Sequence, residues 1–265
     1  MAQRGVPGPS PRPLPASCCA GSTDGIGLHT AQRLASQGAT VLVHGRSEGR
    51  VQQAVQAVQQ AGAGSGGSAQ GFTEDLASLV GVRRLADRVQ RDHPSLHVLI
   101  NNAGDGLEMT YAVNVAAPFL LTACLLGAVR ERVVNVASIS AASSIDFANL
   151  QQWGEAHHSP RIKQERGYSA HGAYSLSKLA DMLFTFGLAA RLQAAGSPLT
   201  CNCLDPGTDA DDELRAATDP SLARVSGAYF VGGRPARSPA VAYDQEVQAR
   251  LWGVLEEQTG AVWSV

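Results

Sequence analysis

A tyrosine and a lysine one helical turn apart form the strongest candidate for chemistry in this sequence. Tyr174 and Lys178 lie in a strongly helical segment, so their side chains share one helix face. A nearby ammonium group stabilises an ionised phenol, which makes such a tyrosine a usable general acid or base near neutral pH. Taken alone, the pair is weak evidence, because this spacing is common among surface residues. Tyr168 is not an equivalent candidate, because Gly172 occupies the matching position.

A glycine-rich stretch predicts a site for a phosphate-containing cofactor. Residues 21–27 read GSTDGIG and lie between a predicted strand and a predicted helix. Glycines there permit a tight turn close to a pyrophosphate, and the free N–H groups of the helix start bind the anion. The spacing differs from the common GxGxxG pattern, so a plain glycine turn is the alternative at this point. The predicted cofactor-binding residues of this stretch are Gly21, Ser22, Thr23, Asp24, Gly25, Ile26 and Gly27.

The end of the second predicted strand indicates which dinucleotide would bind. Sites selective for NAD place an Asp or Glu about 20 residues beyond the glycines, where it holds the ribose 2′-OH. Residues 43–47 read VHGRS and contain no acid, whereas Arg46 offers a guanidinium for a 2′-phosphate. We therefore expect the cofactor to be NADP(H). The alternative is that Arg46 is an ordinary solvated arginine.

These residues require a fold that brings several strand ends together. Short apolar runs alternate with longer segments of helical periodicity, which predicts an α/β fold: a Rossmann-type, doubly wound parallel sheet. We expect one such domain over residues 14–265, after a disordered Pro-rich tail at residues 1–13. Strands are predicted at Ala16–Ala20, Thr40–His44, Ala69–Thr73, His97–Asn101, Arg132–Ala137, Leu199–Leu204 and Ala228–Val231. Helices are predicted at Ile26–Ser36, Glu48–Gln60, Leu79–Arg91, Glu108–Val129, Ala173–Ala194 and Glu246–Glu257.

The composition narrows the class of partners. With 44% hydrophobic and 17% charged residues the chain is globular, and a net charge of -2 gives no footprint for nucleic acid. No apolar run approaches the roughly 20 residues of a membrane span. The five cysteines suggest no disulfide framework, so we expect a reducing compartment, by default the cytoplasm. We expect no metal ion, because the His157-His158 pair lies in a polar loop without spaced partners.

Together the motifs resemble those of the short-chain dehydrogenase/reductase family. In chain order they are the turn at residues 21–27, Asn101-Asn102-Ala103-Gly104, Asn114, Ser138, the pair Tyr174 and Lys178, and Pro206-Gly207. The match extends over nearly the whole chain from residue 16, and the joint occurrence is far more specific than any single motif. Residues 132–136, 146–150 and 184–186 are most similar to the retinol-dehydrogenase-like branch and its plant and algal relatives. That likeness makes the chloroplast the alternative location.

The resemblance implies a catalytic role for four residues. Tyr174 would exchange a proton with the substrate oxygen, and Lys178 would hold the nicotinamide ribose and favour the ionised tyrosine. Ser138 would hydrogen-bond the substrate oxygen, and Asn114 would support a proton relay through water to Lys178. The alternatives are a strand-end turn for Ser138 and a helix-stabilising polar group for Asn114.

The resemblance also implies contacts to the cofactor, which would carry the hydride while the protein orients it. Asp75 and Leu76 would lie beside the adenine, although Asp75 in the alternative interpretation only caps the next helix. The further implied contacts are Asn101, Ala103 and Gly104 on the adenosine side, and Pro206, Gly207 and Thr208 beside the nicotinamide.

Three departures from the family pattern qualify this interpretation. The first predicted strand is poor in Val and Ile and follows a proline, unlike a central parallel strand. The segments after Gly104 and after Thr208, which enclose the substrate in relatives, look shortened. The sequence therefore supports an oxidoreductase that moves a hydride between NADP(H) and a small-molecule carbonyl or alcohol, with a weakly or non-catalytic NADP(H)-binding scaffold or regulator as the alternative. A homodimer stays open, since the helices predicted at Glu108–Val129 and Ala173–Ala194 pair into dimers in many relatives.

Overall fold

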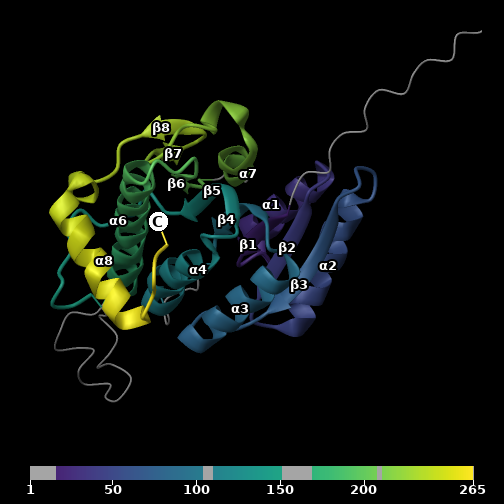
Figure 1. Cartoon of the computed structure of the whole chain (residues 1–265), viewed down its shortest axis with the longest axis horizontal. Helices are drawn as coiled ribbons and strands as arrows, with labels where there is room; N and C mark the ends of the chain where they lie inside the picture. Colours follow the sequence, from purple (N-terminus) through teal and green to yellow (C-terminus); the bar gives the residue numbers. More distant parts are fainter. Residues whose placement is uncertain (1–15, 104–109, 151–168, 208–210, 265) are drawn as a thin grey trace, which may run out of the picture.

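A mostly parallel sheet runs through the protein in the order β3-β2-β1-β4-β5-β6-β7-β8 (Figure 1). The computed structural model describes residues 16–103, 110–150, 169–207 and 211–264. The strands are β1 (Ser17–Ala20), β2 (Thr40–Gly45), β3 (Ser68–Thr73), β4 (Leu96–Asn101), β5 (Val129–Val136), β6 (Thr200–Asp205), β7 (Tyr229–Val231) and β8 (Arg234–Ala236). Only the last pair, β7 with β8, is antiparallel. The strand order reverses at β1, and an open parallel sheet forms its binding crevice at such a point.

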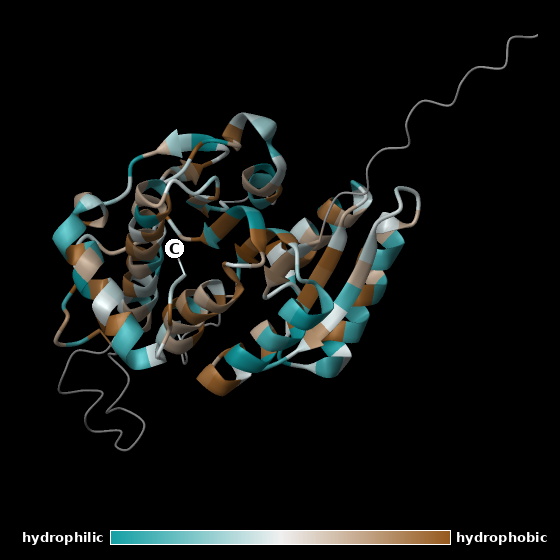
Figure 2. Cartoon of the chain, viewed as in Figure 1, coloured by the Kyte–Doolittle hydropathy of each residue, from teal (hydrophilic) through white to brown (hydrophobic). Residues whose placement is uncertain are grey.

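Helices cover both faces of the sheet and enclose two hydrophobic cores. One core joins α1 (Gly25–Ser36), α2 (Glu48–Gly62) and α7 (Asp211–Thr218) to the sheet. The other core lies under α3 (Leu79–Asp92), α4 (Ala117–Leu125), α6 (Ala170–Ala194) and α8 (Gln245–Thr259). Figure 2 shows hydrophobic residues along the central strands and mostly hydrophilic ones on α2. The predicted doubly wound α/β fold in a single domain is confirmed.

The weak first strand is nevertheless the centre of the sheet. β1 pairs with both β2 and β4, and its four residues are all buried. Its small side chains let α1 pack closely, since the Cys19 thiol lies 3.8 Å from the Gly27 carbonyl oxygen. A buried cysteine behaves as a small hydrophobic residue, so this strand fills its space without Val or Ile.

The helix predicted at Glu108–Val129 is wrong at its C-terminal end. The described part contains a π-helical turn, η1 (Ala112–Ala116), and then α4, which stops at Leu125. Val129 instead begins β5, is 2% exposed, and pairs with the first residue of β4. Hydrophobic periodicity cannot separate the apolar end of a helix from the start of a buried strand. For the same reason the fifth strand begins earlier than its predicted start.

Other described parts of the fold were not predicted, among them α7, the short edge strand β8, the first turn of α6, and the 3-10 helices η3 (Pro220–Leu222) and η4 (Ala240–Tyr243). α6 begins at Ala170 because the Ser169 hydroxyl accepts a hydrogen bond from the Gly172 N–H at 3.2 Å, a helix N-cap. The short β8 returns antiparallel against β7 and has no long apolar run of its own. Such short edge strands leave little pattern in a sequence.

The central part of α6 is buried from Ser175 to Ala189 within a single chain. α8 lies alongside it (Figure 1), and Trp252 of α8 packs 5.0 Å from Phe119 of α4 between ring centroids. Trp263, near the C-terminus, adds a ring contact of 4.5 Å to Trp252. α6, one of the two helices named for a possible homodimer, is thus largely buried over its central part. Within the described ranges, no helix has both the length and the apolar character that crossing a membrane requires.

Candidate active site

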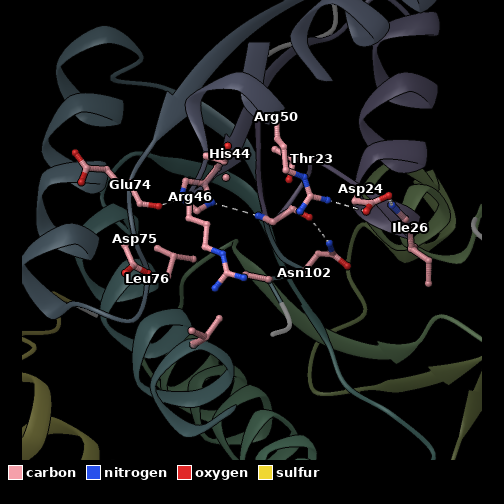
Figure 3. Close-up of a pocket in the computed structure, with 16 residues that line it drawn as sticks. Thr23, Asp24, Ile26, His44, Arg46, Arg50, Glu74, Asp75, Leu76 and Asn102 are labelled. Atoms are coloured by element: carbon pink, nitrogen blue, oxygen red, sulfur yellow. Dashed lines mark hydrogen bonds and ion pairs between the residues drawn. The ribbon is translucent and has the colours of Figure 1, made fainter. Parts of the chain in front are cut away.

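A cavity of about 560 Å³ opens at the carboxyl ends of β1, β2, β3 and β4 (Figure 3). Predicted cofactor residues make up much of its lining, namely Gly21, Thr23, Asp24, Gly25, Ile26, Arg46, Asp75, Leu76 and Ala103. Residues not predicted as contacts complete it, namely His44, Gly45, Ser47, Arg50, Glu74, Asn102 and Val113. The strand ends and the start of α1 therefore meet at one concave surface, as an open α/β sheet requires for a dinucleotide.

The glycine turn owes its shape to close backbone packing. Gly21 has φ +77°, and a Cβ there would lie 2.5 Å from the Cα of Ala103. A Cβ at Gly27 would overlap the Gly21 carbonyl oxygen and the side chain of Asn102. The Asn102 amide donates a 2.7 Å hydrogen bond to the same Gly21 oxygen. The turn leaves room for a group beside its backbone and none for a side chain, so these residues fit a pyrophosphate.

Ser22, Asn101 and Gly27, three predicted cofactor residues, contact other parts of the protein and do not line this cavity. Ser22 is fully buried, and its hydroxyl donates to the Cys19 carbonyl at 2.8 Å and accepts from the His44 N–H at 3.0 Å. The Asn101 amide donates to Thr122 and Asn135 in the core. Gly27 lies behind the turn against Asn102. These residues support the shape of the turn and of the β4 end.

His44 is a neutral support that the sequence did not reveal. It is 3% exposed, and its Nδ1 accepts from the Gly21 N–H at 3.3 Å while Nε2 faces the Glu74 carbonyl oxygen at 3.1 Å. Burial lowers the pKa of His44 to about 4, although the Glu74 carbonyl opposes that shift. The imidazole thus joins the end of β2 to the turns after β1 and β3. A protonated Nδ1 would point a second donor at the Gly21 N–H.

The acidic residues around the cavity have hydrogen-bond or ion-pair partners within the chain. Asp24 caps α1 by accepting from the Gly25 N–H at 2.8 Å, and it also binds Arg50 at 2.7 Å. Glu74 is held by Arg84 at 2.8 Å. Asp75 lines the cavity and also accepts the Ala77 N–H at 3.0 Å in the turn before α3. The N-cap of α3 is Ser78, whose hydroxyl accepts from the Gly81 N–H at 3.4 Å, so the alternative capping role of Asp75 is wrong.

Arg46 follows β2 and extends into the cavity (Figure 3). It stands where an NAD-selective site would carry a carboxylate. Its guanidinium adds positive charge to the cavity that the glycine turn also lines. A guanidinium at this position can donate hydrogen bonds to an anionic group.

The predicted catalytic residues lie beyond this cavity, around the ends of β5 and β6. Ser138 follows β5 and is 8% exposed, and its hydroxyl accepts from the Ser140 N–H at 3.1 Å. Asp205, at the end of β6, accepts from the Ile139 N–H and from the Gly207 N–H, both at 2.7 Å. This carboxylate, which was not predicted, clamps the serine turn to the turn that carries Pro206.

Tyr174 and Lys178 share the inner face of α6, as predicted. The Lys178 ammonium lies 5.7 Å from the centroid of the Tyr174 ring. It donates to the Val136 carbonyl at 2.7 Å and to Asp181 at 3.1 Å. Lys178 is thereby tied to Val136, two residues before Ser138, so the Tyr-Lys face of α6 lies against the end of β5. Asp181 was not predicted.

Asn114 belongs to the same cluster. It lies in the π-helical turn η1, is 1% exposed, and donates to the Ser177 hydroxyl at 3.1 Å. Ser177 in turn donates to the Tyr174 carbonyl at 2.7 Å. π-turns inside helices are frequent at functional sites. Asn114 thus bridges the β4–β5 connection and the helix that carries the Tyr-Lys pair.

Comparison with known proteins places this constellation in a family. The family model described as short chain dehydrogenase matches residues 16–149. The chain is 34% identical to the polyprenol dehydrogenase of Mus musculus, over 95% of this chain and 85% of that protein. It is 32% identical to the retinol dehydrogenase 13 of Homo sapiens, over 88% of this chain and 80% of that protein.

This chain belongs to the short-chain dehydrogenase family. A solved structure of an uncharacterised protein from Mycobacterium paratuberculosis matches with a TM-score of 0.79 and 29% identity, over 95% of each chain. The predicted resemblance, including its retinol-dehydrogenase-like character, is confirmed. The family also accounts for the coincidence of a glycine turn, a strand-end serine and a Tyr-Lys helix in one crevice.

The described residues that follow the predicted shortened segment form α7 (Asp211–Thr218). It begins at Asp211, shortly after Gly207, and packs on α1. Asp211 lies 3.1 Å from His29 and 3.2 Å from Arg33. Thr30 donates at 2.9 Å to Glu213, which is fully buried, and burial raises the pKa of Glu213 to about 7. Gly104 and Thr208, like the predicted tail and His157-His158, lie outside the described residues.

Proposed function

We propose that the protein is an NADP(H)-dependent oxidoreductase that interconverts an alcohol and a carbonyl compound, with Tyr174 as the general acid and base. The observation that carries this proposal is the Lys178 ammonium, which lies 5.7 Å from the Tyr174 ring centroid and donates at 2.7 Å to Val136, two residues before Ser138. Asn101 pairs with Asn135 across β4 and β5, so this cluster stands next to the dinucleotide cavity at the same edge of the sheet.

Bound NADP(H) would supply or accept the hydride. In the reducing direction Tyr174 would give its phenolic proton to the substrate oxygen as the carbonyl carbon becomes an alcohol carbon. The Ser138 hydroxyl would donate a hydrogen bond to that oxygen while negative charge develops on it. The Lys178 ammonium would stabilise the phenolate left on Tyr174, and Asn114 would keep that stretch of α6 in place. The reverse reaction uses the same groups, with Tyr174 as the base.

The preference for NADP(H) is supported by Arg46. Within residues 43–47 the end of β2 carries no acid, and the neighbouring Glu74 is already paired with Arg84. A 2′-phosphate placed near Arg46 would gain a charge-assisted hydrogen bond that a ribose hydroxyl cannot match.

The substrate that the surface supports is a lipophilic alcohol or aldehyde. Ile139 directly follows Ser138 and is 72% exposed. An exposed branched side chain next to the group that binds the substrate oxygen offers apolar contact to the rest of the substrate. The similar polyprenol and retinol dehydrogenases are named for isoprenoid alcohols. The short connection from Gly207 to α7 would leave a long chain free to extend from the crevice.

The deciding test is turnover. We expect NADPH to be oxidised in the presence of long-chain isoprenoid aldehydes or retinal, with much lower kcat/KM for acetaldehyde. Calorimetry on the same protein measures NADPH binding. Tight NADPH binding without turnover across lipophilic and small carbonyl compounds would favour the alternative, a catalytically weak scaffold. That alternative draws on the shortened segment after Gly207 and on the buried pairing of Lys178 with Asp181.

A further inference from the structure

Beneath the reactive face of α6 lies an ion pair that the mechanism above does not use. Lys178 and Asp181 are each 5% exposed, and the ammonium lies 3.1 Å from the Asp181 carboxylate. Charges this deeply buried are costly unless each has a partner. Each group therefore compensates the buried charge of the other, and either one alone would be an uncompensated buried charge.

The pair is anchored to the sheet at a point close to Ser138. Besides Asp181, the ammonium donates to the carbonyl of Val136, the last residue of β5, at 2.7 Å. Ser138 lies two residues further along the chain. A carbonyl from β5 and a carboxylate from α6 thus hold the ammonium from two sides. This arrangement fixes its distance to the Tyr174 ring.

We propose that Asp181 is a positioning residue for the reaction at Tyr174: its carboxylate holds the Lys178 ammonium at the end of β5 and offsets part of the charge with which Lys178 stabilises the Tyr174 phenolate. The inference rests on the proposed function, because it concerns the same acid–base step. Asp181 touches neither substrate nor reacting atoms and acts through Lys178.

Other charged and titratable groups face this pair from neighbouring elements. Glu213 of α7 interacts electrostatically with Lys178, and Cys203 of β6 with Asp181. Burial raises the pKa of Asp181 to about 6, although Lys178 opposes that shift. Asp181 therefore loses its charge at a mildly acidic pH. Below that pH the ammonium is no longer offset, so its stabilisation of a phenolate is stronger.

The test is Asp181→Asn, which keeps the shape and an oxygen acceptor and removes the charge. The matched control is Asp87→Asn on the exposed side of α3. We expect the acid limb of kcat/KM for alcohol oxidation to move to lower pH in Asp181→Asn by several-fold in proton concentration. An ionisation near pH 6 in the wild-type profile should disappear in the variant. Asp87→Asn should superimpose on the wild type.

A readout without turnover separates this inference from the proposed function. The ultraviolet titration of Tyr174, obtained by subtracting the Tyr174→Phe spectrum, should also move to lower pH in Asp181→Asn. If the wild type turns over no substrate, the proposed function fails and the titration still decides the role of Asp181. If Asp181→Asn does not fold, Asp181→Glu displaces the ammonium, and it should lower kcat while retaining the ionisation near pH 6. Titrations and pH profiles equal to wild type, with only a lower Tm, would show a purely structural role and overturn the inference.

Discussion

The two halves of the crevice, the glycine-turn cavity and the cluster at the end of β5, depend on different interactions. In the proposed adenosine half, the turn itself depends on backbone shape and neutral groups: Gly21 with φ +77°, the Asn102 amide, and a buried His44 whose Nδ1 accepts from the turn. The catalytic half depends on buried charge, with Lys178 and Asp181 in contact and Glu213 nearby. Binding in the first half is therefore vulnerable to added volume, and chemistry in the second half is vulnerable to changes in charge.

The same difference gives the two halves opposite responses to pH. His44 has a pKa lowered from 6.5 to about 4, so the unfolded chain takes up its proton first and stability is lost as pH falls through that range. Glu213 has a pKa raised from 4.5 to about 7, so the folded protein holds its proton longer and stability is lost as pH rises through that range. His44 therefore lowers the free energy of unfolding as pH falls, and Glu213 lowers it as pH rises.

The largest expected effect is on chemistry alone. Tyr174→Phe removes the proton that the substrate oxygen needs, so kcat should fall by about 100- to 10,000-fold, the usual contribution of a general acid. The NADPH Kd, measured by calorimetry, should change little, because the adenosine half is untouched. Tyr243→Phe, on a ring that stacks with Phe186 away from the site, is the control. Equal turnover in Tyr174→Phe and wild type would remove Tyr174 from the mechanism.

Adding volume to the glycine turn should weaken NADPH binding, in contrast to Tyr174→Phe. Gly21→Ala forces a side chain into positive φ and against Ala103, so the free energy of unfolding should fall by about 2 kcal/mol and the NADPH Kd should rise at least about tenfold. Gly253→Ala is the matched control, because that position in α8 has ordinary φ and open space. It should stabilise the protein by about 0.5–1 kcal/mol, as measured by urea unfolding. An unchanged NADPH Kd in Gly21→Ala would contradict the shape-based account of this half.

A charge change in the catalytic half tests the opposite pH response. Glu213→Gln removes a carboxylate whose ionisation is opposed by burial, so the loss of stability between pH 4.5 and about 7 should shrink, by on the order of 2 kcal/mol. The acid-side loss from His44 should persist in the variant, which provides an internal reference. Glu257→Gln, on the exposed side of α8, controls for net charge. Parallel curves of Tm against pH for the Glu213→Gln variant and wild type would show that Glu213 is not the titrating group.

In both halves, the features that could be predicted from the sequence are those that leave a local pattern. A turn with positive φ demands glycine, so Gly21 and Gly25 leave a mark in the sequence that can be read without coordinates. The parallel strands leave a similar mark, and even the weak β1 was placed correctly within one residue. The missed His44 has no such mark, because its role depends on which tautomer two backbone groups select.

Buried charges leave no comparable pattern. Asp181 looks like a polar residue on an apolar helix, and only the packing of α6 against β5 shows that it contacts Lys178. Asp205 likewise becomes a clamp only because the turns after β5 and β6 lie side by side. The acidic run at residues 211–213 gives no sign of a buried residue, but α7 turns Glu213 into the core against Thr30. These contacts join residues far apart in the chain, which a local pattern cannot encode.

The smallest expected effect is that of Arg46→Asp, which tests whether a charge in the adenosine half contributes to cofactor binding in addition to its shape. Arg46→Asp should weaken NADPH binding about tenfold or more, equal to about 1.4 kcal/mol, and should strengthen NADH binding, because a carboxylate can accept from a ribose hydroxyl and repels a phosphate. Arg234→Asp makes the same charge change on an exposed residue of β8 and should leave both affinities unchanged. If Arg46→Asp lowers both affinities equally, then Arg46 supplies only general attraction for anions. In that case the preference between the two cofactors would have to arise from the cavity wall around Asp75.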